Sequence, residues 1–171
     1  MIERPDKLNN QAILLASDGD YTSAIACFKR AILIERDNYL LWYNLGVTYR
    51  DCGDFANSYS ALLKSHQINP ENDDVLETLA AICLELKMPD KTVEFCEEGL
   101  ERNDSNPHFW NLLGVTFFQE EMFIEASESF EMAVSFNPYY LDALINLHDT
   151  YEELGNENGR IECEKRIKEI S

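Results

Sequence analysis

The chain lacks several features that would assign it to a class at once. The 171-residue sequence contains no run of about 18 apolar residues of the kind that spans a membrane. Its start, MIERPDKLNNQ, lacks the apolar segment of a secretory signal. Its five cysteines are an odd number and none are spaced as Cys-x-x-Cys, so a disulfide framework is not expected and a reducing compartment fits best. These absences predict a soluble cytoplasmic protein.

Basic residues are missing from a long stretch, because no Lys or Arg lies between Arg102 and Arg160. The formal net charge is −18, and residues 71–171 carry 24 acidic but only 7 basic side chains. This half should repel nucleic acid phosphates and anionic lipid head groups, so neither a nucleic acid nor a membrane is expected as a partner. Solubility explains the acidic surface at least as well as a basic partner does.

The sequence also offers no catalytic or metal-binding constellation. Its three histidines, His66, His108 and His148, lie far apart, without His-x3-His or a Cys/His cluster at metal spacing. No nucleophile has a base at motif spacing, and there is no glycine-rich phosphate loop. We therefore expect no enzymatic activity, no metal and no cofactor.

What the sequence does contain is a repeat of 34 residues. WNLLGVTFF at Trp110 nearly copies WYNLGVTYR at Trp42, 68 residues earlier, which is twice 34. Apolar or small residues recur at positions 4, 7, 8 and 11 in most repeats and at positions 20, 24 and 27 in the first four, and this spacing predicts two amphipathic helices per repeat. The five repeats are residues 5–38, 39–72, 73–106, 107–140 and 141–171.

Turn residues separate the two expected helices of a repeat. Gly19, Gly53 and Gly155 stand where the first helix should end in the left-handed conformation, and each is followed by an Asp or Asn that caps the second helix. Small residues at positions 8, 20 and 27 let two helix axes approach, and a large residue at position 24 fills the space beside them. We expect ten antiparallel helices of about 12–15 residues and no strand.

Two motifs carry a family resemblance. W-x2-L-G-x2-Y or F occurs at residues 42–49 and 110–117, and A-x3-F at residues 24–28 and 126–130. These motifs resemble the signature of tetratricopeptide-repeat (TPR) proteins over residues 5–171. The resemblance implies an all-α fold, a right-handed superhelical solenoid of helix-turn-helix repeats that forms a single domain over residues 1–171.

The two ends of the repeat array differ. In repeat five, Arg160 and Glu164 replace the small and aromatic residues, so the last helix is expected to act as a polar cap. Near the N-terminus, Ile13, Leu14 and Leu15 form an apolar run that nothing else in the chain is expected to cover. Two alternatives remain open there, self-association through the N-terminal helix or an ordinary frayed end.

The resemblance also implies a binding surface. In TPR proteins the first helices line a concave groove that holds a peptide or a helix of a partner. The basic clamp of the chaperone-binding subclass is absent, because Asp74 and Thr78 stand at its positions. The expected groove residues have an apolar floor and an acidic rim, and they are Tyr43, Asn44, Val47, Arg50, Asp74, Glu77, Ala81, Leu84, Glu85, Asn111, Val115, Phe118, Asp149 and Glu152.

This surface predicts an interaction scaffold that binds an apolar, basic segment of a partner protein. The alternative is a structural protein whose repeats stack with other copies of the same chain.

Overall fold

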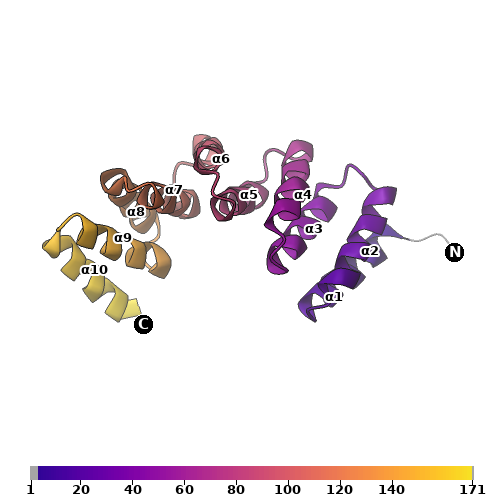
Figure 1. Cartoon of the computed structure of the whole chain (residues 1–171), viewed down its shortest axis with the longest axis horizontal. Helices are drawn as coiled ribbons and strands as arrows, with labels where there is room; N and C mark the ends of the chain where they lie inside the picture. Colours follow the sequence, from indigo (N-terminus) through magenta and orange to yellow (C-terminus); the bar gives the residue numbers. More distant parts are fainter. Residues whose placement is uncertain (1–3, 171) are drawn as a thin grey trace. The chain divides into compact units, whose positions relative to one another are not determined.

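The computed structural model describes residues 4–170, and these residues form ten α-helices and no strand (Figure 1). The all-α class and the expected number of helices are therefore confirmed. Each helix has 13 or 14 residues, within the expected range. The helices are α1 (Pro5–Ser17), α2 (Tyr21–Ile34), α3 (Tyr39–Asp51), α4 (Phe55–Ile68), α5 (Asp73–Glu85), α6 (Pro89–Arg102), α7 (Pro107–Gln119), α8 (Phe123–Phe136), α9 (Leu141–Glu153) and α10 (Glu157–Ile170).

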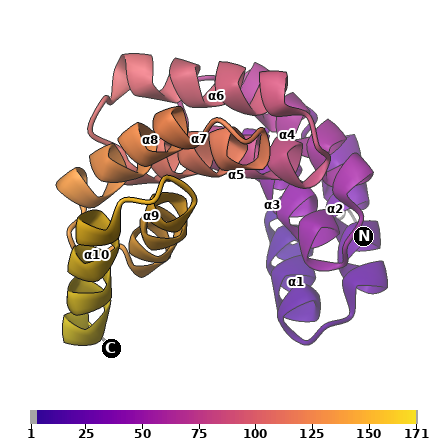
Figure 2. The ribbon, with the colours of Figure 1, turned by 60° about the vertical axis from the view of Figure 1, so that its left-hand side comes forward.

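The helices group into two compact units, Met1–Lys87 and Met88–Ser171. In unit 1, α1 packs against α2 and α3 against α4, and α5 packs on α4. In unit 2, α7 packs against α8, α6 packs on α7, and α9 and α10 lie side by side (Figure 2). The boundary falls between the two helices of the third repeat, and the single domain over residues 1–171 stays a prediction.

The turns inside the repeats follow the glycine pattern. Gly19, Gly53 and Gly155 have φ values of 82°, 82° and 66°, so the predicted left-handed helix ends are confirmed. Lys87 (φ 55°) and Glu121 (φ 60°) take the same place in repeats three and four. The turn geometry is therefore retained where the sequence gives no glycine, at the cost of a left-handed conformation that side chains with a Cβ disfavour.

The predicted caps of the second helices also form. The carboxylate of Asp20 accepts the backbone N–H of Ser23 at 3.1 Å, and Asp54 accepts that of Asn57 at 3.2 Å. Asn156 caps the last helix in the same way. Two hydrogen bonds lower the pKa of the Asp20 carboxyl group, because they favour its charged form. The larger effect comes from the side chain of Ser23 and the smaller from its backbone N–H.

Small and large residues meet between the two helices of a repeat, as the pattern predicted. A Cβ added to Gly46 would lie 2.6 Å from Leu62, and one added to Gly114 would lie 2.5 Å from the ring of Phe130. Ser58, another small position, is fully buried, and its hydroxyl donates to the carbonyl oxygen of Gly46 at 2.8 Å. The close approach of the two helices thus depends on the small side chains.

Apolar side chains from both helices of each repeat fill the cores. Phe28 in unit 1 and Phe109 and Phe130 in unit 2 are at most 1% exposed. Burying a side chain of this size contributes about 1.5–3 kcal/mol relative to leaving it in water. A shared core therefore holds the first and second helices of these repeats together.

Candidate partner-binding surfaces

The first-helix face of unit 1 comprises the expected groove residues of α3 and α5, two helices in contact with each other. Its apolar members Tyr43, Val47, Ala81 and Leu84 are half-buried, and so is Glu77, whereas Asp74 and Glu85 are exposed. Arg50, the basic member, is exposed but donates to the carboxylate of its neighbour Asp51 at 2.9 Å. The face therefore combines a partly accessible apolar strip with acidic side chains and a locally neutralised arginine.

The first-helix face of unit 2 comprises the corresponding residues of α7 and α9, which are also in contact. Val115 and Phe118 are half-buried and pack against the core of this unit. The ring of Phe118 meets Phe123 edge-on, with centroids 5.3 Å apart. Asp149 and Glu152 are exposed on α9. The apolar strip of unit 2 is therefore only partly accessible to a ligand.

Two asparagines that sequence reasoning placed in the groove form hydrogen bonds between repeats. The side-chain amide of Asn44 donates to Asn9 Oδ1 at 3.0 Å, and that of Asn146 donates to Asn111 Oδ1 at 3.1 Å. Asn111 is buried, at 9% exposure. Each pair joins the first helices of consecutive repeats. The available signal was an Asn at position 5 of repeats one and four with an Asn at position 6 of the next repeat.

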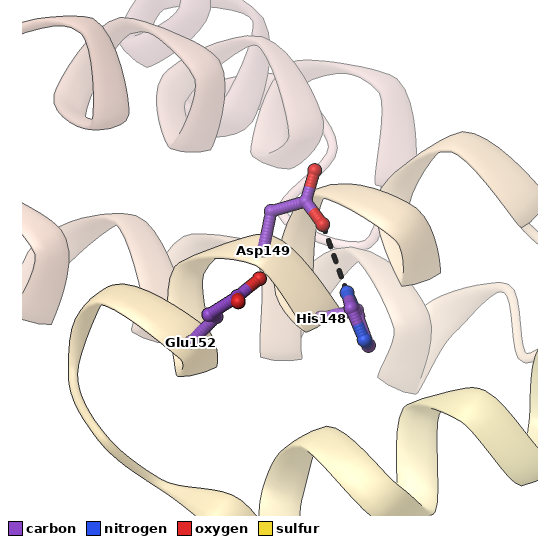
Figure 3. Close-up of side chains that lie close together, drawn as sticks. All are labelled: His148, Asp149 and Glu152. Carbon is purple, nitrogen blue, oxygen red and sulfur yellow. Dashed lines mark hydrogen bonds and ion pairs between the residues drawn. The ribbon is translucent and has the colours of Figure 1, made fainter.

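The last repeat carries a polar cluster on α9 and α10 that the sequence did not reveal, and Figure 3 shows the side chains of His148, Asp149 and Glu152 on α9. His148 Nδ1 lies 2.8 Å from Asp149 Oδ1, and His148 Nε2 lies 3.5 Å from Glu164 Oε1. Glu164 also pairs with Arg160. Position 8 is Ala or Gly and position 24 is apolar in the other repeats, but here they hold His148 and Glu164. Polar contacts therefore replace apolar packing in the last helix pair.

The same cluster has the spacing of a cation site. One donor atom from each of His148, Asp149 and Glu152 lies within 4.8 Å of the others. Asp149 and Glu152 are exposed, however, and both ring nitrogens of His148 already face carboxylates. We assign the cluster to the polar end of the repeat array and assign no metal to it.

Three grooves on the second-helix side share one construction. Each is lined by the second helix of one repeat and by both helices of the next. Groove 1 lies in unit 1 among α2, α3 and α4, groove 2 in unit 2 among α6, α7 and α8, and groove 3 in unit 2 among α8, α9 and α10. The nine lining residues of groove 2 are those of groove 1 shifted by 68 residues, so the two are equivalent sites.

Groove 2 has a volume of about 700 Å³, an apolar floor and an acidic rim. All nine of its lining residues belong to the described part of the chain, and none is basic. Groove 1, of about 510 Å³, has Lys29, Asn57 and Ser60 on its rim instead. The floor of groove 2 consists of Leu100, Trp110, Leu113 and Phe117, its rim consists of Glu97, Glu101, Glu125 and Glu128, and the ninth lining residue, Ser129, is buried.

Paired helices with open faces and intervening grooves define a helical-repeat protein whose surfaces suit protein ligands. The model of a family described as "TPR repeat" matches residues 14–50, and one described as "Tetratricopeptide repeat" matches residues 39–72. These matches cover residues 14–72, and together with the ten-helix fold they support a tetratricopeptide-repeat protein. Within residues 4–170, no helix has the length and apolar character needed to cross a membrane.

Solved structures share this fold. MamA from Desulfovibrio magneticus RS-1 is 16% identical and superimposes with a TM-score of 0.87, covering 99% of this chain and 96% of that one. YrrB, described as "a TPR protein with an unusual peptide-binding site", is 21% identical with a TM-score of 0.74, covering 96% and 84% of the two chains.

A curated relative is much longer. The BBSome complex member BBS4 of Bos taurus is 24% identical over 107 residues, which are 63% of this chain and 21% of that protein. The match thus spans about a fifth of the relative's length.

Proposed function

We propose that the protein is an interaction scaffold whose first-helix faces bind an apolar segment of a partner protein that carries Lys or Arg. The observation that carries this proposal is the composition of α5. Its half-buried Ala81 and Leu84 lie on the same helix as three acidic groove residues, Asp74, Glu77 and Glu85. Apolar contact supplies most of the affinity, whereas the carboxylates speed encounter and disfavour acidic ligands.

The corresponding face of unit 2 supports the same kind of ligand. Val115 and Phe118 offer part of their apolar surface, and Asp149 and Glu152 supply exposed carboxylates on the neighbouring first helix. A peptide is also the class of ligand named for the structural neighbour YrrB. The asparagine pairs are assigned to positioning the first helices, because their amides bond to each other.

The experiment is affinity capture of partners followed by titration of the purified partner. Phe118→Glu should abolish binding, because it places a charge in the apolar strip. Ile124→Glu is the matched control, since Ile124 is 63% exposed on the second helix α8. Partner affinity that survives Phe118→Glu but falls with Ile124→Glu would move the site to the second helices and refute the proposal.

A second candidate is self-association through the N-terminal helix. The observation that favours it is the exposure of Ile13 (45%) and Leu14 (66%) on α1, although Leu15 packs against the core. Two copies could shield these side chains by packing end to end. Leu14→Glu should then lower the mass measured at high protein concentration, whereas a mass that is monomeric at every concentration would eliminate this function.

We further propose a non-catalytic role in the cytoplasm. All five cysteines are free thiols, and Cys52 is exposed. Free thiols are typical of a reducing compartment.

A further inference from the structure

We propose that groove 2 is a second docking site, which takes a Lys or Arg side chain flanked by apolar residues from a protein segment. This site lies on the second-helix side and does not depend on the function proposed for the first-helix faces. The argument rests on three features, namely a fixed aromatic floor, an equivalent groove in the same chain that already holds a cation, and an acidic rim.

The floor of groove 2 is held in place before any ligand arrives. The indole N–H of Trp110 donates to the carbonyl oxygen of Asp104 at 2.7 Å. In groove 1, Trp42 makes the equivalent bond to Arg36 at 2.8 Å. Because this hydrogen bond fixes the ring, little side-chain freedom is lost when a ligand packs on it.

Groove 1 shows which ligand chemistry this construction accepts. The ammonium group of Lys29 lies 5.6 Å from the centroid of the Tyr49 ring, in the range of a cation–π interaction. In groove 2, Glu97 and Phe117 stand at the positions of Lys29 and Tyr49. The aromatic ring is thus retained, whereas the chain's own cation is replaced by a carboxylate.

Groove 3 shows what a carboxylate does when it has a partner at this place. Glu131, the counterpart of Glu97, accepts the hydroxyl of Tyr151 at 2.7 Å. Phe117 occupies the place of Tyr151 in groove 2 and has no hydroxyl to donate. The carboxylate of Glu97 therefore cannot accept a hydrogen bond from a residue at this place, and it stays available to a ligand.

The rim of groove 2 selects the charge of that ligand. Glu97, Glu101, Glu125 and Glu128 are all exposed around an apolar floor, so a cation entering the groove meets carboxylates from two helices. A ring face and several carboxylates together favour an ammonium or guanidinium group over a neutral or acidic one. A second copy of this chain is a poor occupant, because its formal net charge is also −18.

The test uses the two tryptophans as reporters, since Trp42 lies in groove 1 and Trp110 in groove 2. The full chain is labelled with ¹⁵N and titrated with a blocked peptide of alternating leucine and lysine. The indole signal of Trp110 should shift saturably while that of Trp42 stays in place. The shift should weaken between about 0.05 and 0.3 M salt, as screening of the rim increases. A peptide of alternating leucine and glutamate should leave both signals unchanged.

A charge reversal tests the groove itself. Glu97→Lys places in groove 2 the cation that Lys29 provides in groove 1, and it should lower the affinity for the lysine peptide at least tenfold. Glu71→Lys is the control, because it makes the same change of charge at an exposed residue of the loop between α4 and α5. Equal losses for both variants would reduce the effect to overall charge, and an unchanged affinity for Glu97→Lys would overturn the proposal.

Two further outcomes identify the occupant and the site. Phe118→Glu should leave the response of Trp110 intact, since Phe118 does not line groove 2. A response lost in this variant, with the fold intact, would assign the peptide to the first-helix face instead. A Trp110 signal that moves with protein concentration alone would identify a second copy as the occupant, and the proposed foreign segment would be wrong.

Discussion

Gly114 on α7 lies directly against the ring of Phe130 on α8, so closely that an added Cβ would be 2.5 Å from a ring carbon. Phe130 is 1% exposed and belongs to the core of unit 2. The pair shows why the small position of the first helix and the large position of the second recur together. The absence of one side chain creates the space that the other fills.

Gly114→Ala should therefore destabilise the protein. Alanine is intrinsically a better helix former than glycine by about 1 kcal/mol, but overpacking a core typically costs about 1–3 kcal/mol, and here the ring that the new Cβ meets is only 1% exposed. Denaturant unfolding measures the difference. Adding Phe130→Leu should recover part of the loss caused by Gly114→Ala, whereas strictly additive losses would mean that the two sites do not interact.

Glu121→Gly should have the opposite effect. Glu121 has a φ of 60°, the conformation that glycine adopts without steric cost. Relief of this strain outweighs the greater freedom that glycine gives the unfolded chain, so stability should rise by about 0.5–1 kcal/mol. Glu120→Gly is the control, because the φ of Glu120 is −88° and glycine relieves no strain there. This variant should be less stable than the parent protein. A destabilised Glu121→Gly protein would contradict the account of this turn.

Asn146→Ala tests the hydrogen bond between repeats four and five. The change removes the side-chain amide that donates to Asn111 Oδ1 at 3.1 Å. The side-chain oxygen of the buried Asn111 then lacks this donor, which typically costs about 1–3 kcal/mol. The free energy of unfolding of Asn146→Ala, Asn111→Ala and the double variant forms a cycle. The double variant should lose less than the sum of the single variants, and additivity would exclude a coupling between them.

Asp20→Asn should weaken the acid sensitivity of the protein. The pKa of Asp20 is lowered in the folded state by its hydrogen bonds with Ser23. A depressed pKa stabilises the fold above the unfolded value of about 4, and this stabilisation is lost as the pH falls through the folded value. Asparagine keeps the cap but does not titrate. Between pH 5 and 2 the variant should thus lose less stability than the parent, and identical pH profiles would contradict this role.

The first-helix faces could be proposed from sequence because the family resemblance implies that the first helix of each repeat lines a groove. Asn111 shows the limit of that reasoning. It was expected to contact a partner, but the structure places it against Asn146 of the next repeat. A helical period tells which way a residue points, whereas the neighbouring helix decides what it meets.

Grooves 1 to 3 could not be found from the period alone. Glu97 and Phe117 belong to different repeats, and so do Lys29 and Tyr49. They line common grooves only because the second helix of one repeat packs beside the first helix of the next. The nine-residue correspondence at a spacing of 68 was present in the sequence, but nothing in the sequence showed that these nine residues share a surface.

The sequence by itself determined the class of this protein, because local periodicity, turn glycines and capping residues act within one helix or between adjacent helices. The positions of Gly19 and Asp20, the close approach at Gly114 and the ten helices all follow from such short-range rules. Tertiary structure alone decided the left-handed conformation of Glu121, the bond from Asn146 to Asn111 and the carboxylate rim of groove 2. The conformation of Glu121 depends on how α7 and α8 pack against each other. The bond and the rim depend on packing between repeats, where helix stacking sets the distance between two side chains and their separation along the chain does not.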